Sequence, residues 1–477
     1  MSRISLRSAY MWTLGGNLAK SLFGFGLSIL LARLLQPSDY GLVGMVLVVI
    51  SILTILLDLG LGKAVVYFTE EEASLPVCNT VTVASGIILT AVSFWSAPLV
   101  ADFYKDARLT LLLRVLSVNL LLGSFRAVPL GKLTKQFRFR EVTILETVSG
   151  ISAGIIAVLL AWKGFGVWSL VTNLLLSEFL LTVLVYFVQP VSFTLHLRRD
   201  MLQRLLRWGL PFTGSALLWQ FYDNADKLIV GRMLGTAPLG FYSFASRLAM
   251  LPGERISAVI NRVSFSSFSA IKHQRDDVVR HWLSLTRKLA LLVFPILMVL
   301  ALLAEDFLLV VVNRKWLPAA LPVKFLCFMV ALKAVQTIMT TVVTTQGRTD
   351  ITFRFALLNT LVLPVSFWLG ALTGSLAGIG LAWCLAYPPI CAYLLVQTCR
   401  ITGLPVRRYF AELRRPAVAA VLCGLVTVPG LLLLPPGAIR FFLNCTLAGG
   451  CLVLCLLSEK EMRELMLSMI RSRPSPK

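Results

Sequence analysis

The chain has 477 residues, of which 57% are hydrophobic and only 14% are charged. Soluble globular chains carry about 45–50% apolar and about 25% charged residues, so this composition excludes a soluble protein, a disordered chain and a disulfide scaffold. The formal net charge of +22 raises nucleic acid as a partner. The basic residues, however, lie between apolar runs rather than on a polar domain, so we expect a polytopic membrane protein and no nucleic-acid partner.

Fourteen apolar runs reach the length of about 20 residues that a membrane-spanning helix needs. Backbone groups cannot stay unpaired in lipid, so the runs predict an all-α integral membrane protein. The first run is too long for the core of a signal peptide and is followed by Gln36-Pro37-Ser38-Asp39 without a cleavage site, so we interpret it as a first transmembrane helix. The predicted spans are Ser8–Leu31, Gly41–Leu61, Cys78–Tyr104, Leu109–Phe125, Val142–Trp162, Val167–Val188, Gly209–Leu234, Phe241–Val263, Leu289–Ala304, Leu321–Val343, Ile351–Leu372, Leu376–Val396, Pro416–Leu434 and Ala438–Leu457.

The distribution of Lys and Arg predicts the orientation. With both termini in the cytoplasm, 31 of the 45 basic residues fall in cytoplasmic segments and 9 in external ones. The external connections are too short to hold a catalytic domain, and the sequence has no Walker A motif. These features favour a transporter over a membrane polymerase or glycosyltransferase, and we expect no enzymatic activity.

An internal repeat appears at an offset of 199 residues. The segment Arg33–Gly41 shares Arg, Leu and Gly at equal spacing with Arg232–Gly240, and each segment closes the first helix of a six-helix block. Six is an even number, so both blocks insert the same way up, as parallel repeats. We therefore divide the chain into an N-terminal lobe (1–200), a C-terminal lobe (201–400) and two extra helices with a tail (401–477).

Charged residues inside the spans are candidates for a binding cavity, because a charge at a helix centre costs about 2.5–3.5 kcal/mol. The basic ones are Lys20, Lys227, Arg247 and Lys333. We hypothesise that they line a water-filled cavity and attract an anionic head group. The alternative is internal neutralisation, such as an ion pair between Asp223 and Lys227, four residues apart on one helix.

Four acidic residues could carry a coupled proton or sodium ion, or could simply pair with a neighbouring base. They are Glu146, Glu178, Asp223 and Asp226.

The cysteines and histidines do not predict a metal site or a cofactor. None of the nine cysteines forms a Cys-x-x-Cys pair, and we interpret Cys451 and Cys455, one helical turn apart, as packing residues. Two basic stretches, Gln189–Trp208 and Ser264–Lys288, resemble interfacial amphipathic helices held to anionic membrane lipids, the alternative being solvated linkers.

Several segments resemble Wzx-type polysaccharide and O-antigen flippases of the polysaccharide transporter family, in particular its colanic-acid exporter-like branch. These segments are Leu31–Gly41, Asp223–Lys227, Gly231–Gly235, Gly240–Tyr242, Arg247–Pro252 and Lys315-Trp316 with Pro322 and Leu326-Cys327. The resemblance implies the multidrug/oligosaccharidyl-lipid/polysaccharide exporter fold: two six-helix lobes in a V plus two C-terminal helices. It also implies a bacterial inner membrane, coupling to an H⁺ or Na⁺ gradient, and a polyprenyl-diphosphate-linked oligosaccharide as cargo.

In such flippases the cargo diphosphate meets basic residues of the cavity. The matching positions here are Lys20, Arg33, Lys227, Arg232 and Arg247. As sugar contacts we expect Asn17, Tyr222, Asn224 and Gln336. As partners we expect a polysaccharide polymerase and a chain-length regulator around a monomeric transporter. The alternative function is a cation-coupled multidrug exporter of the same superfamily, which predicts cationic cargo and an acidic cavity.

Overall fold

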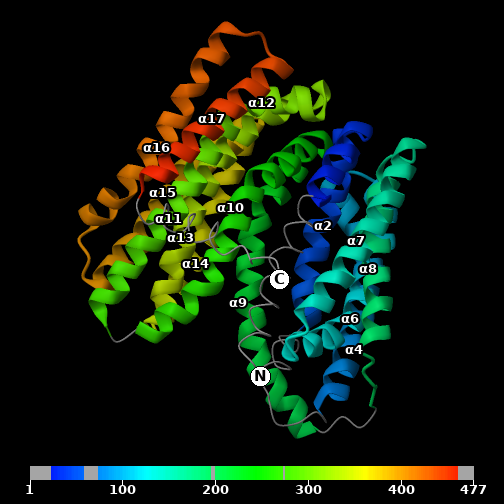
Figure 1. Cartoon of the computed structure of the whole chain (residues 1–477). Helices are drawn as coiled ribbons and strands as arrows, with labels where there is room; N and C mark the ends of the chain where they lie inside the picture. The colour runs from blue at the N-terminus through cyan, green and yellow to red at the C-terminus, as the bar shows by residue number, and fades with distance from the viewer. Residues whose placement is uncertain (1–22, 59–73, 195–198, 272–273, 460–477) are drawn as a thin grey trace, which may run out of the picture. The chain divides into compact units, whose positions relative to one another are not determined.

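The computed structural model describes residues 23–58, 74–194, 199–271 and 274–459, and the predicted cavity residues Asn17 and Lys20 lie outside them (Figure 1). All regular elements within these ranges are helices. The chain divides into two compact units, Met1–Gly240 and Phe241–Lys477. Each unit is described by itself below.

The first unit is built from long apolar helices joined by short turns. Its elements are the apolar helix Phe23–Leu34, α2 (Pro37–Asp58), α4 (Ser74–Tyr104), α5 (Arg108–Leu116), α6 (Val118–Lys135), α7 (Phe139–Trp162), α8 (Val167–Val188), α9 (Arg199–Met233) and the first turn of α10 (Thr236–Ile271). In the turn between α4 and α5, the Arg108 guanidinium donates to both carboxylate oxygens of Asp106 (3.0 and 2.7 Å). This hydrogen-bonded cation lowers the pKa of Asp106.

The second unit contains the rest of α10 and the last seven α-helices, with two short irregular helices between α12 and α13. Its elements are α11 (Arg275–Leu302), α12 (Ala304–Phe307), the π-helix η1 (Leu308–Val312), the 3₁₀-helix η2 (Arg314–Ala319), α13 (Ala320–Thr345), α14 (Thr349–Ala371), α15 (Leu376–Thr402), α16 (Val406–Leu433) and α17 (Ala438–Ser458).

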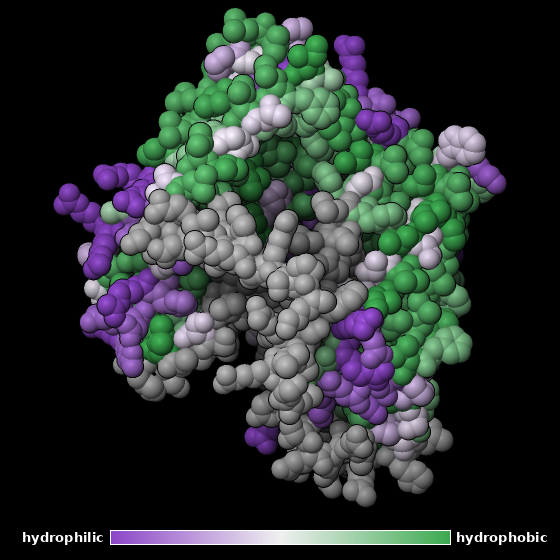
Figure 2. Space-filling view, in the orientation of Figure 1, coloured by the Kyte–Doolittle hydropathy of each residue, from purple (hydrophilic) through white to green (hydrophobic). Residues whose placement is uncertain are grey.

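Eleven helical stretches of the described residues are long and apolar enough to cross a membrane. Large hydrophobic side chains are exposed along them, and the visible described surface is largely hydrophobic with separate hydrophilic patches (Figure 2). The chain is therefore an all-helical, multi-pass membrane protein. Helices α9 and α10 contain the seventh and eighth predicted spans but are not among the eleven, so the count of fourteen stays a prediction.

The two stretches that the sequence marks as interfacial helices are not separate elements where they are described. Residues 199–208 begin the 35-residue helix α9. Residues 264–271 end α10, and 275–288 begin α11. The basic residues do not end these helices, because a helix tolerates Arg and Lys without a break.

The repeat offset of 199 residues reappears in the helix boundaries. One helix ends at Leu34 and α9 ends at Met233, and the next helices begin at Pro37 and Thr236. The first turns of α2 and α10 approach each other so closely that an added Cβ on Gly41 would collide with the Thr236 carbonyl oxygen. An added Cβ on Gly240 would collide with the carbonyl oxygen of Pro37 in the same way.

This contact is reciprocal, because both of its partners are related by the same offset. Gly41 meets Thr236, and Gly240, the counterpart of Gly41, meets Pro37, the counterpart of Thr236. A local two-fold axis produces this kind of pairing. Only glycine allows two backbones this close.

A second recurrence lies at the ends of α6 and α13, at an offset of 210 residues. Gln136 has φ −78° and ψ 2°, and Gln346 has φ −81° and ψ 5°. The next residues are both left-handed, Phe137 at φ 58° and Gly347 at φ 76°. Phe137 therefore adopts the left-handed conformation that is ordinarily taken by glycine, the residue at the equivalent position 347. The same turn conformation thus occurs in both halves of the chain.

Candidate functional site

Helix α9 carries a stack of polar side chains within the first unit. The Lys227 ammonium donates to Asn224 Oδ1 at 3.1 Å, and Asn224 Nδ2 donates to the Gln220 carbonyl oxygen at 3.0 Å. The carboxylate of Asp226, which is buried, accepts from the Lys227 backbone N–H at 2.7 Å. The three-residue spacing of Asn224 and Lys227 brings them to one helix face, so the half-buried ammonium is bonded to a neutral amide.

Two further predicted basic residues occupy equivalent repeat positions in the first unit. Arg232, half-buried on α9, places its guanidinium carbon 5.4 Å from the centre of the Phe103 ring, a cation–π distance. Arg33 is exposed near the end of the helix Phe23–Leu34. Tyr222 is buried on α9, with its ring 5.1 Å from that of Trp219.

Glu178, a predicted ion-coupling residue, pairs with an arginine between α6 and α8. Arg126 donates from Nε at 2.8 Å and from its terminal nitrogen at 2.6 Å, and roughly a quarter of each side chain is exposed. The sequence interpretation assigned Arg126 to a cytoplasmic segment, whereas the structure includes it in α6, inside one of the eleven stretches. Glu146 on α7 and Asp223 on α9 are half-buried.

In the second unit, Gln336 belongs to a buried network that joins α10, α13 and α15. Its side-chain oxygen accepts from the Tyr387 hydroxyl at 3.4 Å. The Trp383 indole packs against Tyr387 at 5.4 Å and donates to the Tyr242 hydroxyl at 2.9 Å. Lys333 is half-buried one turn before Gln336 on α13, and Arg247 on α10 is exposed. Of the predicted site residues of this unit, Gln336 is thus part of this network, and Lys333 and Arg247 lie on two of the helices that the network joins.

Asp306 and Arg440 form a buried ion pair that the sequence analysis missed. Asp306 is fully buried on α12 and Arg440 is 10% exposed on α17. Arg440 donates to the Asp306 carboxylate with Nε (2.9 and 2.8 Å) and with a terminal nitrogen (2.7 Å). The sequence does contain a signal for this pair. Asp306 follows the ninth predicted span and Arg440 lies at the start of the last one, and both are on the predicted external side.

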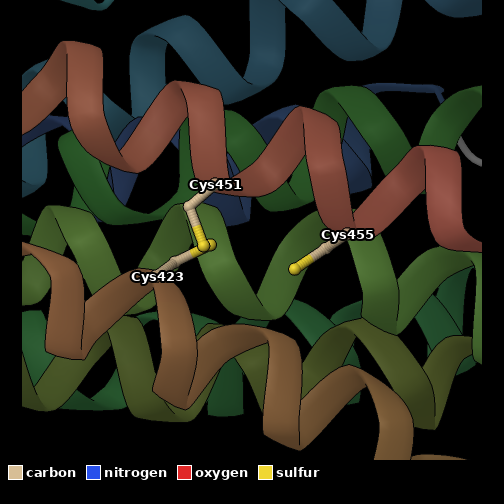
Figure 3. A group of neighbouring side chains, drawn as sticks. All are labelled: Cys423, Cys451 and Cys455. Carbon is tan, nitrogen blue, oxygen red and sulfur yellow. The ribbon is translucent and has the colours of Figure 1, made fainter.

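Three thiols are the group of potential metal ligands that the described residues bring together. Cys423 on α16 lies beside Cys451 and Cys455 on α17, with the three Sγ atoms within 4.8 Å of one another (Figure 3). The sequence analysis considered only the pair on α17. The short turn at 434–437 joins α16 to α17 and folds residues 12–16 positions before and after its centre back onto each other. The sequence therefore contains a signal that Cys423 lies near Cys451.

Comparison with solved structures defines the class. The chain is similar to the lipid II flippase MurJ in an inward closed conformation, with a TM-score of 0.78, 12% identity and coverage of 96% of this chain and 100% of that one. It is also similar to a multidrug resistance MATE family transporter in an inward-facing conformation, with a TM-score of 0.60, 16% identity and coverage of 80% and 96%. At these identities the likeness shows the fold alone, which is like that of MurJ and of the MATE family transporter.

The family follows from sequence comparison. The family described as "Polysaccharide biosynthesis protein" matches residues 30–321, and the chain belongs to it. Similar relatives are the teichuronic acid biosynthesis protein TuaB of Bacillus subtilis (25% identity, 78% of each chain), the succinoglycan biosynthesis transport protein ExoT of Rhizobium meliloti (26%; 93% of this chain and 91% of ExoT) and the lipopolysaccharide biosynthesis protein WzxC of Escherichia coli (24%; 83% and 82%).

These matches confirm the resemblance to Wzx-type flippases. The chain is a polysaccharide biosynthesis transport protein, and not an enzyme.

Proposed function

We propose that this protein is a secondary transporter that moves polyprenyl-diphosphate-linked oligosaccharide repeat units from the cytoplasmic to the periplasmic leaflet of a bacterial inner membrane. The units would serve the biosynthesis of a surface polysaccharide: an exopolysaccharide, a capsule or an O-antigen. The observation that carries the proposal is the half-buried Lys227 ammonium bonded to the neutral Asn224 amide. The names of the relatives, which include succinoglycan transport and lipopolysaccharide biosynthesis, support the same cargo class.

The physical argument starts from the cost of charge in a membrane. A neutral amide does not compensate the positive charge of an ammonium group. Binding of an anionic ligand would compensate it, and is therefore favourable at this position. A diphosphate offers several acceptor oxygens, and charge-assisted hydrogen bonds to it are roughly twice as strong as neutral ones. Arg232 lies five residues further along α9, about 7.5 Å along the helix axis and about 140° around it, so it is a separate candidate. Lys20, Arg33, Arg247 and Lys333 stay candidates for the same cavity.

Movement of the cargo is proposed to follow alternating access, driven by an H⁺ or Na⁺ gradient. The recurrence of helix ends and turns at fixed offsets supports two repeats that move against each other. Glu178 is the acid we favour for coupling, because a carboxylate paired with Arg126 inside an apolar helix bundle can exchange that partner for a cation or proton. Glu146, Asp223 and Asp226 are the other candidates.

The proposal is tested by complementation in the native host with its own copy of the gene deleted. Lys227→Ala is expected to lower surface polysaccharide at least about tenfold at equal protein level, because a charge-assisted hydrogen bond contributes about 1.5–3 kcal/mol. Lipid-linked repeat units should accumulate in the same cells. Lys227→Arg should keep most of the export, since it keeps the charge.

The matched control is Lys324→Ala. Lys324 is also a lysine of a predicted span, but its ammonium pairs with the Glu305 carboxylate at 2.7 Å and it is 40% exposed, so we expect unchanged export. Normal polysaccharide in Lys227→Ala cells would remove the assignment of Lys227. Resistance to organic cations conferred by the wild-type chain, without any change in polysaccharide, would favour a multidrug exporter instead.

A further inference from the structure

The three-thiol group between α16 and α17 has no part in the proposed transport. Cys423 is buried, and Cys451 and Cys455 are partly buried. Figure 3 shows the Cys423 and Cys451 sulfurs pointing toward each other, with Cys455 one turn further along α17. All three Sγ atoms lie within 4.8 Å of one another.

The backbone around these thiols is held in place by close helix packing. An added Cβ on Gly430 of α16 would collide with the side chain of Asn444, which is fully buried on α17. The two helices are joined by the short turn 434–437, and this close crossing fixes their register. Cys451 and Cys455 are spaced i, i+4 and therefore face the same side of α17. The packing of the hairpin thus brings the three cysteines to one place between the helices.

The sulfur spacing suits a metal ion. Thiolates bind Zn²⁺ at about 2.3 Å, so three of them around one ion lie about 4 Å apart. An upper limit of 4.8 Å is within a side-chain rotation of that spacing. A ligand set made of sulfur alone selects thiophilic ions such as Cu(I) and Zn²⁺ over hard ions.

A cavity gives the thiols an access route. It has a volume of about 350 Å³ and lies among α11, α16 and α17, where Cys455 lines it together with Arg414, Arg415 and Glu459. The Glu459 carboxylate accepts a hydrogen bond from Arg415 at 3.0 Å and forms an ion pair with Arg287 at 3.4 Å. Cys455 is thus the member of the group that lines the cavity, from which an ion can reach the three thiols.

We propose that Cys423, Cys451 and Cys455 bind one thiophilic d¹⁰ metal ion, Zn²⁺ or Cu(I), which links α16 to α17. The ion enters through the cavity at Cys455. The site is independent of the cargo and of Lys227, so failure of one proposal leaves the other standing.

The experiment uses the full chain, purified in detergent under a phosphine reductant. Zn²⁺, and separately Cu(I), is titrated in competition with a chromophoric chelator. The wild-type protein should bind one ion per chain, and Cys423→Ser should bind it at least about tenfold more weakly, as loss of a ligand costs more than the 10–100-fold typical of second-shell changes. Cys384→Ser, a half-buried thiol on α15 outside the group, is the matched control and should bind like the wild type.

A second readout covers the case in which Cys423→Ser does not fold. Cys455→Ser, at the cavity, then replaces it, and maleimide labelling followed by mass spectrometry measures protection of the three thiols by the added ion. Protection of Cys455 by Zn²⁺ or Cu(I) supports the site. Equal binding by the wild type and the variants, labelling unaffected by either ion, or a Cys423–Cys451 disulfide in protein kept under reductant would each overturn it.

Discussion

At the scale of single residues, the charged side chains of the helices differ in how they are neutralised. Lys227 is bonded to a neutral amide, Glu178 shares an ion pair that is about a quarter exposed, and Asp306 is fully buried against Arg440. These differences have opposite consequences. A charged group that is hydrogen-bonded only to a neutral side chain, such as Lys227, is suited to binding a ligand of opposite charge. A fully buried ion pair, such as Asp306 with Arg440, is suited to holding a helix in place.

Asp306→Asn should destabilise the protein markedly. The substitution leaves the Arg440 guanidinium buried beside a neutral amide, and breaking a buried pair in this way costs about 3–5 kcal/mol. We expect a clear fall in the Tm of the detergent-solubilised protein. The adjacent Glu305→Gln is the control: its pair with Lys324 has the same 2.7 Å length but is half exposed, so its contribution is about 0–1 kcal/mol.

The double change Asp306→Leu with Arg440→Leu should recover most of the loss, because an apolar pair of similar volume carries no desolvation cost. Equal Tm shifts in Asp306→Asn and Glu305→Gln would show that burial of the pair is not what stabilises this end of α17.

At the scale of helices, the reciprocal contact of α2 and α10 is the most constrained feature of the first unit. Gly41→Ala and Gly240→Ala should each lower protein yield and Tm, because the new methyl group meets a backbone carbonyl that cannot rotate away. Gly24→Ala is the control, since a Cβ there meets nothing within 4 Å and alanine favours the helix by about 0.5–1 kcal/mol.

The double variant Gly41→Ala with Gly240→Ala should lose less than the sum of the single losses, since both methyl groups force the same separation of the two helices. Strictly additive losses would contradict a shared contact.

The helices also show what a sequence can and cannot supply. Apolar runs predicted the long helices, because lipid leaves the backbone no alternative. The Asn224–Lys227 bond was within reach, since it depends only on helical spacing. The Asp306–Arg440 pair joins residues 134 positions apart, and the Cys423 contact depends on the crossing of two helices, so neither follows from periodicity. The break at Ser117 between α5 and α6 lies inside the fourth predicted span. Nothing in the apolar or charged pattern of the sequence around Ser117 predicts it.

At the scale of the whole molecule, the count of spans and the distribution of charge lead to the same orientation. The eleven stretches, with α9, α10 and the helix that ends at Leu34, give fourteen crossings if each crosses once. An even number places both termini on one side, and the excess of Lys and Arg indicates the cytoplasm. The turns after α6 and α13, which share a conformation and an arginine at Arg138 and Arg348, fall on that same side.

Reporter fusions in cells check this orientation. Green fluorescent protein after Lys477 or after Arg348 should fluoresce, and alkaline phosphatase at the same points should be inactive. Alkaline phosphatase after Lys163, in the connection of α7 and α8, should be active because the charge distribution predicts that connection to be external. An active phosphatase at Lys477 together with an inactive one at Arg348 would mean an odd number of crossings after α13. The distribution of Lys and Arg would then not predict the orientation, and it would no longer support the equivalence of the two halves.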